Sequence, residues 1–309
     1  MSISNRKDEH LKYAKEQSET TNDFDLIKLE HNSLPLLNYS DVDITSNFLG
    51  FKVNYPFYIN AMTGGSKQAL EVNEKLAKIA SHFNLPFVLG SQSAALKDES
   101  LINTYKIVRD LNPNGIVVAN VNANATLEQA KKAIEMVGAN ALSIHINVIQ
   151  ELVMDEGDRE FSHWQENIKT IVSNVGVPVI VKEVGFGMSK KTLETLKSLG
   201  VKYVDISGSG GTNFSKIERM RNESLDLTFE NIGISTVESL KNAKDSGLTI
   251  HASGGIRNAL DIYKALKLGA SNVGLSKYFL KLTELSLSEA ISEVERLISN
   301  LIKCYIIFS

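Results

Sequence analysis

The stretch VPVIVKE, residues 177–183, decides the fold. It is apolar up to Lys182, which is typical of a strand buried on both faces of a parallel sheet. A segment with helical apolar spacing and a closing glycine, KKTLETLKSLG at residues 190–200, comes next. A second β-branched and aromatic run, VKYVDIS at residues 201–207, follows it directly. This order predicts two parallel strands joined by a helix.

The same alternation continues in both directions along the chain. It gives eight candidate strands: FYINAM from Phe57, PFVLG from Pro86, GIVVANV from Gly115, ALSIHI from Ala141, VPVIVKE, VKYVDIS, LTIHAS from Leu248 and ASNVGL from Ala270. Most are separated by about ten to twenty residues with helical apolar spacing, as in EVNEKLAKIASHF and ALDIYKALKLG. We therefore predict an α/β fold, a TIM (β/α)8 barrel. A doubly wound open sheet is the alternative, but it does not naturally need eight evenly spaced units.

Length and spacing define the domain organisation. A chain of 309 residues with 43% hydrophobic content suits one α/β barrel or two ordinary domains, and the strand pattern selects a single domain over residues 1–309. A polar stretch of roughly 50 residues precedes the first strand and is expected to form an N-terminal extension. About forty residues separate VDIS from LTIHAS, which predicts an insertion after strand 6 that partly covers the barrel mouth.

Composition excludes several classes of function. The net charge of −3 and the scattered charged residues give no basic face, so nucleic acid is not expected as a partner. A single cysteine, Cys304, excludes an internal disulfide framework and suits a reducing cytoplasm. The charged start has no apolar signal region and no run of eighteen apolar residues occurs, so we expect a soluble cytoplasmic protein without a membrane partner. Barrels of this size commonly assemble, so a homo-oligomer is expected.

Two glycine-rich segments follow the sixth and seventh strands, SGSGGTN from Ser207 and SGGIR from Ser253. Active sites of such barrels lie at the carboxyl ends of the strands, and loops near the last strands frequently bind phosphate there. Glycine lets the backbone approach an anion, and the next helix offers its positive N-terminus. Tight turns are the ordinary interpretation of each segment alone, but two on adjacent strands favour a phosphorylated cofactor or substrate.

Charged and amide groups follow two other strands. Lys182 either reaches solvent or points into the mouth as a cation for an anionic ligand, and we favour the second. HINVIQE, residues 145–151, places a carboxylate beside amides, which suits Mg2+ completed by water and a diphosphate. A hydrogen-bonded core histidine and a solvated helix start are the alternatives. The N-terminal RKDEH, residues 6–10, is by itself interpreted as a solvated helix face.

Seven motifs in order identify a resemblance. They are RKDEH, AMTGG, GSQSAAL, HINVIQELVMDEGDREF, VKEVGFGMS, SGSGGTNF and ASGGIRNALDIYKALKLGA. Together they resemble the flavin-dependent type 2 isopentenyl-diphosphate delta-isomerase family, over about residues 5 to 280. The resemblance implies a TIM barrel that interconverts isopentenyl diphosphate and dimethylallyl diphosphate by allylic proton transfer. It also implies reduced FMN and Mg2+ as cofactors, with NADPH as the flavin reductant.

The resemblance also implies residue roles. Gln150, Lys182 and His145 would be catalytic, and Glu151 would ligate Mg2+. Substrate contacts would come from the N-terminal extension and three strand ends, namely Arg6, Lys7, Ser91, Gln92, Ser93, His145, Asn147 and Gln150. The residues expected around FMN are Ala61, Met62, Thr63, Ser91, Asn120, Lys182, Ser207, Thr212, Gly254, Gly255, Ile256, Arg257, Leu275 and Ser276.

The chain departs from the family pattern at three places. Val148 stands where members often carry proline, which affects loop stiffness, and Ser93 stands where a basic residue is common. The chain closes with CYIIFS from Cys304, where members continue through a further helical segment. We expect this apolar tail to replace an amphipathic helix, to leave part of the outer surface uncovered and to lower stability.

Two other interpretations remain open. An FMN-dependent 2-hydroxy-acid oxidoreductase-like barrel would share the late phosphate loops, but it leaves HINVIQE and RKDEH unexplained. A non-catalytic flavin-binding barrel is supported by the atypical tail and opposed by the intact polar mouth.

Overall fold

A computed structural model describes residues 3–18, 21–222, 225 and 228–309 of the chain. Within these residues eight parallel strands close into a barrel, with β10 pairing both β9 and β3. The strands are β3 (Phe57–Ile59), β4 (Phe87–Val88), β5 (Val117–Asn122), β6 (Ala141–His145), β7 (Val179–Lys182), β8 (Tyr203–Asp205), β9 (Thr249–Ser253) and β10 (Asn272–Leu275). All eight predicted strands and the predicted barrel are confirmed.

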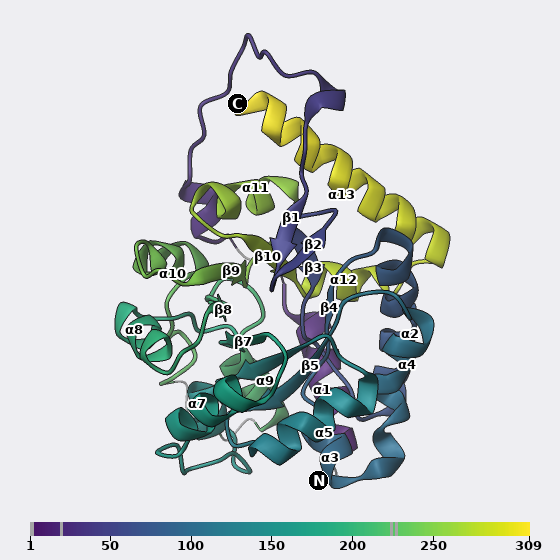
Figure 1. The fold of residues 1–309 in the computed structure, drawn as a ribbon, viewed down its shortest axis with the longest axis vertical. Helices are drawn as coiled ribbons and strands as arrows, with labels where there is room; N and C mark the ends of the chain where they lie inside the picture. The colour runs from purple at the N-terminus through teal and green to yellow at the C-terminus, as the bar shows by residue number, and fades with distance from the viewer. Residues whose placement is uncertain (1–2, 19–20, 223–224, 226–227) are drawn as a thin grey trace.

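Helices surround the barrel, as Figure 1 shows. The outer ring is formed by α2 (Lys67–Phe83), α4 (Asn103–Leu111), α5 (Leu127–Val137), α7 (Trp164–Asn174), α8 (Lys190–Ser198), α10 (Thr236–Ala243), α11 (Ala259–Lys267) and α13 (Leu287–Ile307). Shorter elements are α3 (Ser93–Lys97), α6 (Val148–Val153), α9 (Phe214–Arg221), α12 (Lys277–Leu282), η1 (Asp23–Leu26), η2 (Tyr39–Asp41) and η3 (Glu99–Leu101). The predicted insertion after the sixth strand is confirmed, because α9 lies between β8 and α10.

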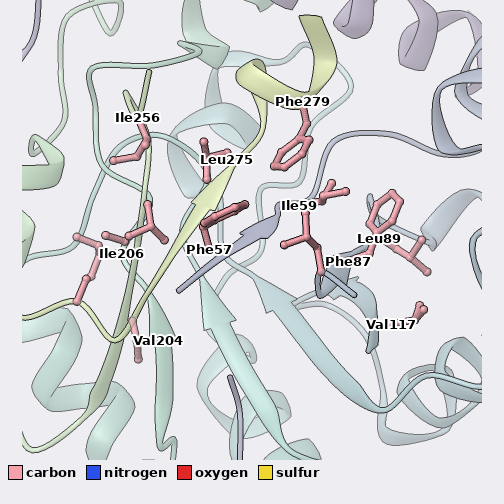
Figure 2. Close-up of a cluster of buried hydrophobic side chains, with 14 of the residues drawn as sticks. Phe57, Ile59, Phe87, Leu89, Val117, Val204, Ile206, Ile256, Leu275 and Phe279 are labelled. Carbon is pink, nitrogen blue, oxygen red and sulfur yellow. The ribbon is translucent and has the colours of Figure 1, made fainter. Parts of the chain in front are cut away.

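Alternation along the strands separates an outer and an inner layer. Phe57, Ile59 and Leu275 belong to the large apolar cluster beneath the helices, part of which Figure 2 shows. Tyr58, between two of these outward residues, belongs to a second, smaller cluster inside the barrel. A hairpin formed by β1 (Ser46–Phe48) and β2 (Phe51–Val53) contributes Phe48 to that inner cluster. The hairpin therefore closes one end of the barrel with apolar side chains.

The N-terminal helix α1 (Ile3–Glu16) packs against α9 and α12. Its partner α9 starts where the Asn213 side chain accepts a hydrogen bond from the Lys216 backbone N–H. Gln17, just after α1, makes two hydrogen bonds of 2.9 Å with the Asn213 backbone. These contacts hold α1 over the carboxyl ends of the strands. The interpretation of RKDEH as a merely solvated helix face is therefore wrong.

The end of the chain also differs from expectation. Residues 304–307 continue α13 as its last turn, with Cys304 buried. The Tyr263 hydroxyl on α11 donates to the Phe308 backbone oxygen at 3.0 Å, and the Tyr305 ring meets the Tyr263 ring edge-on. The tail thus extends an amphipathic helix along α11 and covers the outer surface, so the prediction of an uncovered surface is wrong. No helix among the described residues is sufficiently long and apolar to span a bilayer.

Candidate active site

A cavity of about 900 Å³ opens at the carboxyl ends of the barrel strands. It is walled by strand ends on one side and by α1, α6, α9 and α12 on the other. The predicted site residues that line it are Arg6, Lys7, Ala61, Met62, Thr63, Ser91, Ser93, Asn120, His145, Asn147, Gln150, Glu151, Lys182, Ser207, Thr212, Gly254, Gly255, Ile256, Arg257 and Ser276. The structure thus brings together residues separated by up to 270 positions in sequence.

Two predicted site residues lie elsewhere. Gln92 is fully buried behind the cavity wall, where its amide donates to the Ala133 backbone oxygen at 2.9 Å and accepts from the Asn120 backbone N–H at 2.9 Å. Leu275 is buried in the outer cluster, as Figure 2 shows, so its side chain faces the helices. Both residues hold the wall in place, and we assign neither a ligand contact.

Lys182 lies at the floor of the cavity and is 6% exposed. Its ammonium donates to the Glu183 backbone oxygen at 2.8 Å and to the Ser207 hydroxyl at 3.1 Å. Burial raises the pKa of the neighbouring Glu183 to about 8, against the lowering effect of backbone N–H groups and Lys182. The choice made from sequence, a cation pointing into the mouth rather than to solvent, agrees with this position.

His145 is half-buried beside the same floor. Its Nδ1 lies 3.0 Å from the Asn120 side-chain oxygen. Burial, together with the positive charges of Lys7 and Lys182, lowers the pKa of His145 to about 3. The ring is therefore neutral near pH 7. As a neutral imidazole it can orient a ligand or donate one hydrogen bond, but it is not a general acid of ordinary strength.

One face of α6 carries the amides and the carboxylate of HINVIQE. Both carboxylate oxygens of Glu151 accept hydrogen bonds, from the Asn147 amide at 2.8 Å and from the Asp158 backbone N–H at 2.9 Å. The Asn147 side-chain oxygen is buried without a protein hydrogen bond. Asn147, Gln150 and Glu151 are all buried and all line the cavity. Because buried acceptors are normally paired, the Asn147 oxygen marks a place for a donor or a cation.

Glu218 on α9 was not predicted from the sequence. It is 1% exposed, accepts from the Gln150 amide at 3.0 Å, pairs with the Arg221 guanidinium, and lies 2.9 Å from His10 Nε2. Burial works to raise the pKa of Glu218, but hydrogen bonds and charges from His10, Gln150 and Arg221 hold it below its ordinary value. An ionised Glu218 therefore fixes the orientation of the Gln150 amide.

The two glycine-rich loops meet each other at the cavity edge. A Cβ on Gly254 would lie 2.0 Å from the Gly208 backbone oxygen, and the Gly254 φ of +91° is itself strained for any other residue. A Cβ on Gly211 would lie 2.6 Å from the Gly255 backbone nitrogen. The backbones of the two loops thus pack directly against each other at these glycines, and such glycine-rich backbone at a cavity edge suits a phosphate group.

The N-terminal extension closes over these loops. The Asn22 amide donates to the Gly255 backbone oxygen at 2.8 Å. Arg257 pairs with Asp25 at 2.6 Å and with Asp261 at 2.8 Å, and its backbone N–H also donates to Asp261. The Arg257 side chain therefore ties the extension to the second loop, and the sequence contained no signal for this pairing.

These residues fit FMN. The glycine-rich loops would hold the phosphate, and the buried Thr63 hydroxyl at the cavity wall, which has no protein hydrogen bond, would be left for a polar ring atom. For Mg2+ the protein offers the Glu151 carboxylate and the Asn147 oxygen. Among the described residues no group of three or more His, Cys, Asp or Glu side chains is arranged to hold a metal ion. A cation here would complete its shell with water and ligand phosphate.

Comparison with known proteins places this cavity in a class. The FMN-dependent dehydrogenase family model matches residues 96–299. Flavocytochrome b2 with sulfite bound aligns with a TM-score of 0.69 and 19% identity over 98% of this chain and 75% of that chain. A mandelate dehydrogenase chimera aligns with a TM-score of 0.66 and 16% identity, over 97% of this chain and 87% of that chain. The chain is thus an FMN-dependent (β/α)8-barrel protein.

More similar relatives define the family. "Isopentenyl-diphosphate delta-isomerase" of Latilactobacillus sakei is 52% identical over 88% of this chain and 79% of its own. The protein of that name in Staphylococcus epidermidis is 46% identical over 96% of this chain and 87% of its own length. The chain belongs to the isopentenyl-diphosphate delta-isomerase family, and it is an FMN-dependent isomerase of isoprenoid biosynthesis. Identities of 46–52% to proteins named as this isomerase decide against the 2-hydroxy-acid oxidoreductase and the non-catalytic barrel, because the two solved oxidoreductases are only 16–19% identical.

Proposed function

We propose that the cavity binds FMN over its floor and holds the substrate diphosphate and Mg2+ between α1 and α6. The observation that carries this proposal is the placement of Arg6 and Lys7 on α1 and of Glu151 on α6 around one cavity. Two cations suit a diphosphate, and Glu151 suits a hard cation that bridges to it. On this proposal the N-terminal 50 residues are part of the active site.

Moving a double bond by one carbon requires a proton to be added at one end of the alkene and another to be removed at the other. Reduced FMN supplies a proton donor and acceptor next to the alkene when it is bound. Lys182 would provide a positive charge next to the bound cofactor, since it lines the cavity floor. Gln150 and the neutral His145 orient the substrate chain, with Gln150 itself held by Glu218. Helix α1, which lies over the mouth, would limit the access of water to the substrate.

Arg6 and Lys7 restrict the diphosphate while the carbon chain reacts. A diphosphate is a good leaving group once positive charge develops at the allylic carbon. Cations and a metal that hold it in place limit its loss. Ser91 and Ser93, whose hydroxyl oxygens lie 3.0 Å apart at the cavity wall, offer neutral donors to the same group. The substitution of a basic residue by Ser93 thus leaves a weaker contact rather than none.

The metal is tested by a matched pair of variants. Glu151→Gln keeps the size of the side chain and removes its charge, while Glu160→Gln changes an exposed carboxylate in the same region. We expect Glu151→Gln to abolish the Mg2+ dependence of substrate binding and of isomerisation, and Glu160→Gln to behave as the wild type. Calorimetric titration of substrate with and without Mg2+ measures this. An unchanged Mg2+ dependence in Glu151→Gln would remove Glu151 from the proposal.

We also propose that NADPH reduces the bound FMN, that the protein forms a homo-oligomer and that it works in the cytoplasm. Leu34 is 84% exposed and Leu36 is 95% exposed on the extension, where apolar surface favours contact with a second copy. Anaerobic bleaching of the bound FMN absorbance by NADPH tests the reductant, and light scattering tests the assembly. A monomer that retains full activity would refute the oligomer.

A further inference from the structure

Beneath the cavity floor, the Asp205 carboxylate lies 3.5 Å from the Lys182 ammonium. Asp205 is 1% exposed and Lys182 is 6% exposed, so both charges are withdrawn from water. The two residues end neighbouring strands, because Lys182 of β7 pairs with Asp205 of β8 in the sheet register. The Lys182 ammonium therefore has the cavity on one side and a carboxylate on the other.

Four donors surround Asp205. One oxygen accepts from the Tyr58 hydroxyl at 3.0 Å and from the Asn60 amide at 3.0 Å. The other accepts from the Ser253 hydroxyl at 2.7 Å and from the Ser207 backbone N–H at 3.1 Å. Both oxygens of Asp205 thus act as hydrogen-bond acceptors, and each of them already has two donors. The donors come from β3, β8 and β9 and fix the carboxylate in position.

Two of these donors also reach the cavity wall. Asn60 accepts from the Ala61 backbone N–H at 2.8 Å, and Ser207 accepts from the Lys182 ammonium at 3.1 Å. Ala61 and Ser207 both line the cavity. Asp205 itself does not line the cavity, so it acts on a ligand only through other residues.

We propose that Asp205 is a positioning residue: it holds Lys182 as an ammonium ion and fixes the direction in which that ion faces the flavin. This inference rests on the proposed function of Lys182. A buried ammonium without a counter-charge tends to lose its proton, because burial disfavours the charged form. The Asp205 carboxylate offsets that tendency. The protein can therefore keep a positive charge at the cavity floor at the pH at which it works.

Other titratable groups surround the pair. His145 on β6 and Lys7 on α1 line the cavity, and Glu183 after β7 lies close enough to Lys182 for its pKa to respond to that charge. Tyr58 on β3 and His251 on β9 lie on the side of Asp205, and burial with the Asp205 charge raises the pKa of Tyr58 well above its ordinary value. Tyr58 therefore stays protonated. A pH effect that depends on Asp205 must be separated from those of His145, Glu183, Lys7 and His251.

The experiment compares Asp205→Asn, Lys182→Met and the double variant as holoenzymes, with Tyr58→Phe as control. Tyr58→Phe removes one donor from Asp205 and leaves both charges. We measure kcat and KM for isopentenyl diphosphate and the reduction potential of bound FMN from pH 6 to pH 9. Asp205→Asn should lower kcat by about tenfold to a hundredfold at pH 9, with less loss at pH 6 and little change in KM. Tyr58→Phe should stay within about threefold of the wild type.

The potential of bound FMN provides a second signature. At pH 9 the reduction potential of FMN bound to Asp205→Asn should be close to the potential measured in Lys182→Met. At pH 6 the two potentials should differ, because Lys182 is then protonated in Asp205→Asn. Adding Asp205→Asn to Lys182→Met should change kcat and the FMN potential little, because Asp205 acts through Lys182, which that variant already lacks. Losses in kcat that multiply in the double variant, or a loss in Asp205→Asn that is the same at every pH, would overturn the inference and leave Asp205 a structural residue.

The two possible failures are distinguishable. If Lys182→Met leaves both kcat and the potential unchanged, the proposed function of Lys182 fails and the inference fails with it. If Lys182→Met is strongly impaired and Asp205→Asn is not, only the inference fails. Should Asp205→Asn not fold, the double variant should fold better, since removing both partners of a buried pair costs less than removing one. Equal loss of folding in both would also overturn the inference.

Discussion

Lys7 gives the cavity a charge that changes with pH just above neutrality. Burial, together with like-charge repulsion from the adjacent Arg6, lowers the pKa of Lys7 from 10.5 to about 8. At 1.36 kcal/mol per pH unit, this lowering corresponds to about 3 kcal/mol of unfavourable interaction for the ammonium in the ligand-free site. A bound diphosphate supplies the opposite charge and relieves it. Substrate binding should therefore depend on the protonated form of Lys7.

The sign of the effect follows from the direction of the shift. Because the pKa of Lys7 is lowered, the ammonium is present below about pH 8 and is lost as the pH rises through that value. We expect kcat/KM, which reports the free enzyme, to be level up to about pH 8 and then to fall about tenfold per pH unit. Lys7→Met should lack this decline and should be about ten to a hundred times less active at neutral pH.

Steady-state kinetics at several pH values, with reduced FMN held saturating, measures the decline. Lys12→Met is the matched control, because Lys12 lies on the same helix with a side chain that is 64% exposed. It should retain the wild-type profile. Arg6→Gln removes the like charge and should move the decline to higher pH. A decline that persists in Lys7→Met, or a wild-type kcat/KM that stays level up to pH 9.5, would refute the reasoning.

Three further predictions concern stability. Burial lowers the pKa of His251 to about 4, so folding favours the neutral ring, and the free energy of unfolding should decrease as the pH falls from 6.5 towards 4. His251→Phe should remove about 3 kcal/mol of that decrease. Urea unfolding at the two pH values measures it. Leu301→Ala on α13 should lower the free energy of unfolding by about 2 to 5 kcal/mol, because Leu301 is fully buried in the core. An unchanged free energy of unfolding would show that α13 does not contribute to the core. Gly64→Ala should unfold the cavity wall or abolish FMN binding, because its Cβ would lie 1.9 Å from the Tyr105 ring, and normal FMN absorbance in the purified variant would contradict this.

The barrel was predictable because each strand is a local signal. A parallel strand buries both of its faces, so its sequence is a continuous apolar run, as in VPVIVKE. The strand ends could then be assigned to one mouth from topology alone. Two predicted contacts differ from their neighbours in the direction of the side chain. Leu275 faces the helices and Gln92 faces α5, although their neighbours line the cavity.

The contacts that cross the mouth were not predictable. Glu218 lies in a charged segment, SKIERMR, that resembles any exposed helix, and its burial depends on His10 of α1 and Gln150 of α6. Asp205 is hidden within VKYVDIS in the same way, as one polar residue in an apolar run. Such pairings form only after the barrel closes. The sequence therefore predicts which residues reach the mouth more readily than which of them meet there.

The most direct test of the central claim is an anaerobic reaction of the purified chain with isopentenyl diphosphate in deuterated water, followed by NMR. The account predicts dimethylallyl diphosphate with deuterium in the carbon chain, formed only when FMN is present and reduced, and without net consumption of reductant after the first reduction. Bound, reduced FMN without any isomerised or deuterated product would contradict it.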